Sequence, residues 1–136
     1  YEHSLAVADL ARVLAKSHHY DEDKAYFAGL VHDIAKELSP EAMINLSTTM
    51  KNRGLYPIDY FDYKVANPNL LHGVAATEIL YSELGITDLK ILVAIAHHTT
   101  GGAGLDQLSK FTFMADFIEP LRDFKEATKI RKVFVF

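Results

Sequence analysis

Apolar residues recur every three or four positions along most of the chain, which is the spacing of a helix that buries one face. Together with capping residues, this pattern predicts helices over about residues 2–17, 22–36, 40–52, 70–84, 88–99, 106–119 and 122–133. No stretch alternates apolar and polar residues as a half-buried strand does. The predicted fold class is therefore all-α, a bundle of about six to seven helices.

Helix-end signals support several of these boundaries. Ser39 followed by Pro40 is typical of a helix start, and Gly54 and Gly85 follow the last periodic residue of their helices. Residues 55–69 are the least regular part and are rich in aromatic and acidic side chains. We expect a loop there with one short helical turn, which either forms a ring-binding wall beside a site or packs over the core.

Composition adds three observations to this picture. The chain has 136 residues, 49 % of them hydrophobic, which is enough for one core. Its 14 basic and 18 acidic side chains give a formal net charge of −4, and an acidic chain lacks the basic surface that nucleic acid requires. It has no cysteine, which excludes disulfides and thiolate metal ligands.

We expect one domain over residues 1–136. No apolar run approaches a membrane span, and no signal peptide is evident, so a cytoplasmic protein without membrane partners is expected. The chain begins with Tyr1 and ends on the apolar run 133–136, from which we expect native residues beyond both ends. A homodimer is a further expectation.

Six polar residues interrupt the apolar faces of the predicted helices. They are four histidines and two aspartates, namely His3, His32, Asp33, His72, His98 and Asp116. Taken singly, each has an ordinary explanation, a buried group bonded to a carbonyl or an arginine. Taken together they need six buried partners, whereas one or two metal ions satisfy all six. Nitrogen and oxygen donors without sulfur suit iron, manganese, zinc or nickel.

Small residues precede the doublet formed by His32 and Asp33. In a helix, Ala25 and Ala28 share a face with His32, and Gly29 lies one turn below Asp33. This bare face lets another helix, or an ion, come close to the two polar groups.

Four local strings place these residues in the order His, His-Asp, His, His, Asp. The strings are LVHDIAKE at 30–37, LHG at 71–73, HTTG at 98–101 and ADFIEPLR at 115–122. In this order they resemble the HD-domain metal-dependent phosphohydrolases and, more closely, the YqeK family of symmetrical diadenosine tetraphosphate hydrolases. The resemblance covers essentially the whole chain and implies an HD-domain bundle with a dinuclear metal site in its core.

The resemblance implies a role for each of the six residues. The core ligands of the family match His3, His32, Asp33 and Asp116. The added ligands of its two-metal branch match His72 and His98. Asp33 is then expected to bridge two transition-metal ions, with iron ranked before manganese, zinc and nickel.

The expected chemistry follows from two neighbouring cations, which share a water and lower its pKa to give hydroxide near neutral pH. The hydroxide attacks phosphorus in line with the leaving oxygen while the cations neutralise the phosphate oxygens. Asp33 and Lys36 are the expected catalytic residues; Lys36 contacts either a phosphate or its acidic neighbours. Further candidate phosphate contacts are Thr99, Thr100, Gly101 and Arg122, and the alternative for Arg122 is a solvated pair with Glu119 or Asp123.

The leading prediction is an enzyme that converts diadenosine tetraphosphate into two ADP. A second hypothesis is an HD nucleotidase or a cyclic-dinucleotide phosphodiesterase. The doublet of His97 and His98 fits the phosphodiesterase branch, but the Gly-Tyr-Pro string of that branch is absent. A third is a silent nucleotide-binding module, although silent modules usually lose ligands and all six are present. We expect His97 outside the ligand shell and His18 and His19 exposed.

Overall fold

The structure is a computed structural model that describes residues 2–58, 61–98 and 106–119. Every regular element in these ranges is helical, which confirms the all-α fold class. The elements are α1 (Glu2–Ser17), α2 (Glu22–Val31), α3 (Pro40–Arg53), α4 (Phe61–Ala66), the 3₁₀ helix η1 (Pro68–Leu71), α5 (His72–Leu84), α6 (Leu89–Ala96) and α7 (Gln107–Ile118). None of the described helices is both long and apolar enough to span a bilayer. The helix predicted over 122–133 lies outside the described residues.

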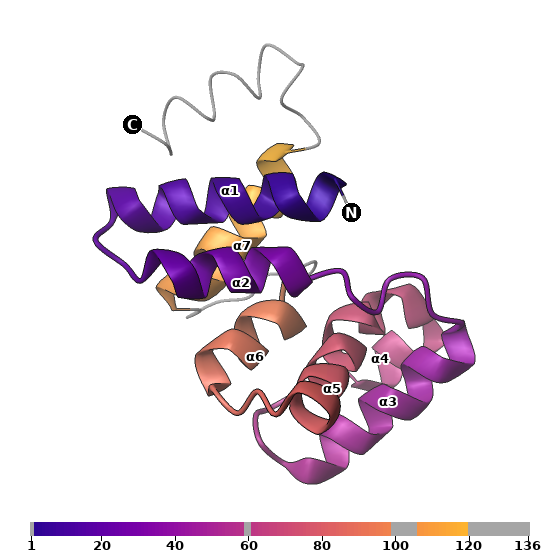
Figure 1. Ribbon diagram of the computed structural model, residues 1–136. Helices are drawn as coiled ribbons and strands as arrows, with labels where there is room; N and C mark the ends of the chain where they lie inside the picture. Colours follow the sequence, from indigo (N-terminus) through magenta and orange to yellow (C-terminus); the bar gives the residue numbers. More distant parts are fainter. Residues whose placement is uncertain (1, 59–60, 99–105, 120–136) are drawn as a thin grey trace.

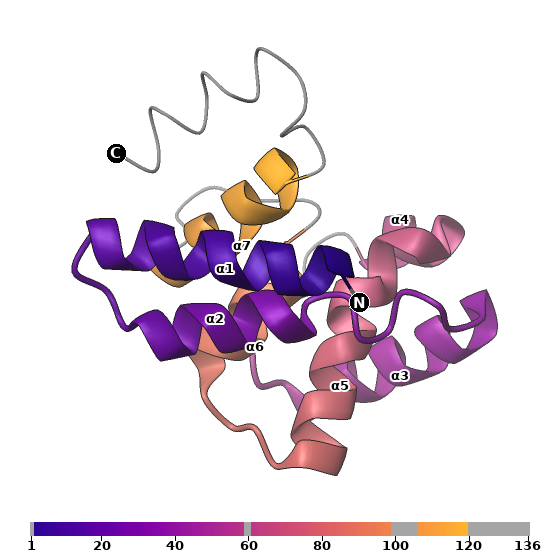
Figure 2. The same cartoon turned by 45° about the horizontal axis from the view of Figure 1, so that its top comes forward.

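The helices form two neighbouring bundles. Figure 1 shows α1 and α2 side by side with α7 behind them, while α3, α4 and α5 gather on the other side. Helix α6 packs against both α5 and α7 and so joins the two parts. In Figure 2 the start of α1 and the end of α2 lie at the side of the molecule that faces α5. Helix ends therefore meet between the two bundles.

Capping follows the sequence signals. The Ser39 hydroxyl accepts a hydrogen bond from the backbone N–H of Ala42 at 3.1 Å, which caps α3. Gly54 and Gly85 end α3 and α5 with φ values of 68° and 67°, a left-handed conformation in which a side chain is strained.

Two helices end earlier than their periodicity predicts. Helix α2 ends at Val31 rather than near residue 36, and α6 ends at Ala96 rather than near residue 99. After each end a histidine ring, that of His32 or His98, donates Nδ1–H to the carbonyl of the residue three positions before it, at 2.6 Å in both cases. The imidazole thereby satisfies a carbonyl that a further helical turn would otherwise use.

Residues 55–69 contain more helix than the single turn we expected, since they hold α4 and the first two residues of η1. Tyr56 is buried, and its hydroxyl lies 2.7 Å from the Thr77 hydroxyl. Because Thr77 donates to the Val74 carbonyl at 2.6 Å, Tyr56 donates to Thr77. Tyr56 therefore packs in the core and is not part of a ring-binding wall; residues 59 and 60 lie outside the described residues.

Two glycines allow the close approach of helices on either side of a cluster of polar side chains. A Cβ on Gly29 would lie 2.8 Å from Ala8 Cα, so the bare face of α2 meets α1, as its small residues predicted. A Cβ on Gly73 would lie 2.6 Å from the Ile95 carbonyl oxygen, so the start of α5 touches the end of α6. A side chain at either position would force apart the helix ends that carry the polar cluster.

Candidate metal centre

The six residues singled out from the sequence lie together where the helix ends meet. Their donor atoms form two overlapping groups, and within each group all donor atoms lie within 4.8 Å of one another. The first donor group consists of His3, His32, Asp33 and Asp116. The second donor group consists of Asp33, His72 and His98. The six residues are thus divided into two sets that have only Asp33 in common.

Asp33 directs one carboxylate oxygen to each group. Its Oδ2 lies 3.2 Å from His32 Nε2 and 3.8 Å from His3 Nε2. Its Oδ1 lies 3.3 Å from His98 Nε2 and 3.4 Å from His72 Nε2. A carboxylate in this position is able to bridge two cations.

Each histidine ring is held by its Nδ1 atom, so that Nε2 faces the centre. His32, His72 and His98 donate Nδ1–H to the carbonyl of the residue three positions earlier, at 2.6, 2.7 and 2.6 Å. His3 differs, because it donates Nδ1–H to Glu119 Oε2 at 2.6 Å. Carbonyls and carboxylates only accept hydrogen bonds, so each Nδ1 carries the proton and each Nε2 is left as a donor for a metal.

A cation fits the spacing of these donors. The Nε2 atoms of His72 and His98 lie 2.9 Å apart. Since both rings already carry a proton on Nδ1, two neutral rings would bring two lone pairs together, which requires a proton or a cation between them. In the first group Asp116 Oδ1 lies 2.9 Å from His3 Nε2 and 3.2 Å from His32 Nε2, while the distance from Asp33 Oδ2 to His3 Nε2 is longer, 3.8 Å. Donors about 2.0–2.1 Å from one ion lie about 3.0–3.4 Å from each other.

Both aspartates are ionised at neutral pH. Burial opposes ionisation of Asp33, but hydrogen bonds donated through Nε2 by His32, His72 and His98 in their protonated form outweigh it and lower the pKa of this carboxyl. The pKa of Asp116 is lowered in the same way, with His32 as its strongest partner. Burial disfavours the charged form of His32, yet its contacts with Asp116 and Asp33 raise the pKa of this ring to about 9. Protons and metal ions therefore compete for the same atoms.

Lys36 lies at the rim of the centre. Its Nζ is 3.9 Å from Asp33 Oδ2, and 59 % of its side chain is exposed. The amine is thus close enough to neutralise Asp33 and open enough to meet an anion from solvent. Both alternatives considered for Lys36 fit this position.

Other sequence-predicted residues lie where they were expected, or outside the described residues. His97 donates Nδ1–H to the Val93 carbonyl at 2.9 Å and belongs to neither donor group. His18 and His19 are exposed, as predicted. The candidate phosphate contacts Thr99, Thr100, Gly101 and Arg122 lie outside the described residues, so their roles stay predictions.

Glu119 is a site residue that the sequence reasoning missed. It was considered only as an alternative partner of Arg122, but it is buried and holds the ring of His3. The signal was its spacing, because Asp116 and Glu119 stand three positions apart and so share a helix face. A carboxylate behind a metal-binding imidazole fixes the ring and raises its basicity.

An all-helical bundle with a His-Asp doublet in its core is typical of HD-domain proteins, and the sequence profile of the HD domain matches residues 1–130. The chain also resembles a solved structure from Clostridium acetobutylicum, described as a predicted HD superfamily hydrolase involved in NAD metabolism. The two superpose with a TM-score of 0.85 and 41 % identity, over 99 % of this chain and 68 % of that one. The HD-domain fold class is thereby confirmed.

Two curated relatives are named "Bis(5'-nucleosyl)-tetraphosphatase, symmetrical". The protein from Halalkalibacterium halodurans is 35 % identical over 131 residues, 96 % of this chain and 66 % of its own. The protein from Bacillus subtilis is 34 % identical over 133 residues, 98 % of this chain and 68 % of its own. The chain therefore belongs to the HD-domain family and, within it, to the YqeK family, as its motifs predicted. It spans about two thirds of the length of these relatives.

Proposed function

We propose that this protein is a metal-dependent phosphohydrolase that cuts dinucleoside tetraphosphates in the middle and releases two nucleoside diphosphates. The observation that carries this proposal is the position of Asp33, which directs one oxygen to each of two donor groups. The names of the curated relatives supply the substrate class.

The proposed cofactor is a pair of transition-metal ions, iron ranked first and manganese, zinc or nickel as alternatives. The first donor group would hold one ion and the second donor group the other. When bound, such a pair supplies a water of lowered pKa and neutralises charge on phosphate.

The protein's own residues hold this arrangement rigid. Backbone carbonyls fix three imidazoles and Glu119 fixes the fourth, so the Nε2 atoms stay directed at the centre. Lys36 presents a positive charge at the rim, where a polyphosphate approaches. Thr99, Thr100, Gly101 and Arg122 remain proposed phosphate contacts.

Symmetrical cleavage requires that the second phosphate from a bound nucleoside lies over the centre, with a nucleoside diphosphate as leaving group. Hydrolysis of diadenosine tetraphosphate in ¹⁸O-labelled water tests this, with the products separated by chromatography. We expect only ADP, with one labelled molecule per event. ATP with AMP would place the reacting phosphate one position away and contradict the proposal.

The same assay separates the alternatives. Rapid turnover of a cyclic dinucleotide without hydrolysis of the tetraphosphate would favour the phosphodiesterase hypothesis. Nucleotide binding without turnover in metal-loaded protein would favour the silent module. Asp33→Asn is the matched variant for comparison with the wild type in this assay. It keeps the size of the side chain and removes the negative charge that both donor groups share.

The single-domain organisation, the cytoplasmic location and the homodimer stay predictions. Sedimentation of the purified protein tests assembly, and a monomer at micromolar concentration would contradict the dimer. Cell fractionation tests the location, and limited proteolysis that yields two stable fragments would contradict a single domain.

A further inference from the structure

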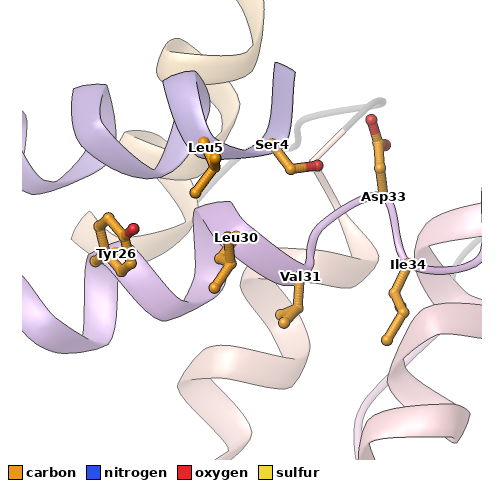
Figure 3. A pocket seen from close by; sticks show the side chains of 7 residues that line it. All are labelled: Ser4, Leu5, Tyr26, Leu30, Val31, Asp33 and Ile34. Carbon is orange, nitrogen blue, oxygen red and sulfur yellow. The ribbon is translucent and has the colours of Figure 1, made fainter. Parts of the chain in front are cut away.

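A hollow of about 410 Å³ lies between α1 and α2, directly beside the metal centre. Its lining includes Ser4, Leu5, Tyr26, Leu30, Asp33 and Ile34. Figure 3 shows Asp33 at one end and Tyr26 at the other, with Leu5 and Leu30 between them. Asp33 belongs to both donor groups and also lines the hollow, so the two adjoin at this residue.

The chemistry of this hollow is apolar with a few polar groups. Leu5 and Leu30 are only half-buried, and Ile34 is 44 % exposed, so these side chains line a surface rather than the core. The Ser4 hydroxyl, the Tyr26 hydroxyl and the Asp33 carboxylate are the polar side-chain groups of the lining. An aromatic ring and apolar walls, with polar groups near one end, are typical of a site for a ring-shaped ligand that carries a polar tail.

The Tyr26 ring is held in place from one side. The Arg12 guanidinium lies 4.1 Å from the centroid of this ring, and Arg12 Nη2 lies 3.6 Å from Asp23 Oδ1. A cation over one face restricts the motion of the ring. A ring fixed in advance loses less entropy when a ligand stacks on it.

The length of the hollow suits a nucleoside diphosphate. At the rise of a helix, Tyr26 and Val31 are about 7.5 Å apart along α2, and Asp33 lies two residues beyond the end of that helix. A span of this order separates the base from the second phosphate of an extended nucleoside diphosphate. A base near Tyr26 therefore puts its second phosphate near Asp33, where symmetrical cleavage needs it.

We propose that the hollow between α1 and α2 binds one nucleoside of the substrate, with the base against Tyr26 and Leu30 and the ribose beside Ser4. The inference rests on the proposed function and adds to it the base-binding residues. It places the base away from the ring-binding wall considered at residues 55–69, where Tyr56 is buried and bonded to Thr77.

The test compares ADP with inorganic pyrophosphate as ligands of the metal-loaded protein, by titration calorimetry. Both carry two phosphates, but only ADP has a base. We expect Tyr26→Ala to weaken ADP binding about tenfold, the scale of one base-aromatic stack, and to leave pyrophosphate within about twofold. Tyr26→Phe keeps the ring and should restore most of the ADP affinity. Leu89→Ala, an exposed apolar residue at the start of α6, is the control away from the hollow.

Ile34→Ala is a second variant that removes little buried surface, since this side chain is 44 % exposed. It should weaken ADP about threefold without affecting pyrophosphate. ADP binding unchanged in both alanine variants would overturn the inference. Equal weakening of ADP and pyrophosphate would also overturn it, because that pattern indicates damage to the metal centre.

Hydrolysis of diadenosine tetraphosphate by the same wild-type preparation separates this inference from the proposed function. Hydrolysis with an unchanged KM in Tyr26→Ala would overturn the nucleoside site alone. ADP binding that depends on Tyr26, without hydrolysis, would overturn the proposed function alone. A wild-type protein that binds pyrophosphate but not ADP would overturn the inference directly.

Discussion

The two donor groups share Asp33 but differ in charge and in how their histidines are held. The first has four donors, two of them carboxylates, and a third carboxylate stands behind it because Glu119 accepts from His3. The second has three donors among the described residues, and Asp33 is the only carboxylate of these three. Both of its histidines are held by neutral backbone carbonyls, those of Asn69 and Ile95.

This difference predicts that the two donor groups bind metal with different affinity and differ in how open they are to water or phosphate. More negative charge around the first group favours tighter binding of its cation. Fewer protein donors in the second group leave more positions for water or phosphate, which is the arrangement of a catalytic rather than a structural metal site. We therefore expect the ion of the second group to exchange more readily.

The largest effect is expected from Asp33→Ala, which removes the residue common to both donor groups. Metal should be lost from both groups, and hydrolysis should fall by more than the roughly 100-fold that loss of an outer-shell partner causes. Metal analysis of protein purified without chelator, with a hydrolysis assay, measures both. A variant that keeps either ion and its activity would show that Asp33 is not shared.

His98→Ala separates the two groups, since His98 belongs only to the second. We expect this variant to bind one ion per chain where the wild type binds two, with hydrolysis lost. His97→Ala is the matched control, because its side chain is bonded to the Val93 carbonyl and lies in neither group. Equal loss of metal in the two variants would mean that the roles of His97 and His98 are misassigned.

Glu119→Gln tests the first donor group separately, as His98→Ala tests the second. The amide oxygen still accepts from His3 Nδ1, but the negative charge behind the first group is removed. Affinity for the ion of the first group should fall about 10–100-fold while the second group is unchanged. Competition titration against a chelator measures this; equal weakening of both ions, or of neither, would contradict the assignment of Glu119 to the first group.

Asp88→Ala has the smallest expected effect and leaves both groups intact. Asp88 caps α6 by accepting from the Lys90 N–H at 2.9 Å, and it pairs with Lys24 Nζ at 2.6 Å. We expect a loss of about 1 kcal/mol in the free energy of unfolding in urea, with unchanged metal content. Loss of metal from this variant would contradict the expectation, because it would show that the fold and the centre are coupled through α6.

The same variant has a defined pH dependence. The hydrogen bond from Lys24 lowers the pKa of Asp88 below its ordinary value. Because the pKa of Asp88 is lower in the folded than in the unfolded protein, its ionised form stabilises the fold at pH values above the unfolded-state pKa of about 4. This stabilisation is lost as the pH falls through the folded-state pKa. The difference between wild type and variant should therefore be constant above about pH 5 and shrink below about pH 4.

Much of the fold and of the cluster could be predicted from the sequence, because both depend on periodicity. Of the predicted stripe, Val7 and Leu14 lie on the buried face of α1 and Leu10 is partly buried against the core, and His3 stands one turn before Val7. The small residues before His32 predicted a close helix contact, which is made where Gly29 meets Ala8.

The remainder depends on contacts between distant residues. Periodicity continues past Val31 and Ala96, but the rings of His32 and His98 take the terminal carbonyls and end these helices. Glu119 lies 116 positions from His3, so no local pattern pairs them. The hollow beside Asp33 exists only because α1 and α2 pack side by side.

The most direct test of the central claim, that Asp33 is shared by two metal ions, is anomalous diffraction from crystals of the metal-loaded protein. We predict two anomalous peaks, one beside Oδ2 with His3, His32 and Asp116, and one beside Oδ1 with His72 and His98. A single peak with both Asp33 oxygens on one ion, at full metal loading, would contradict the claim.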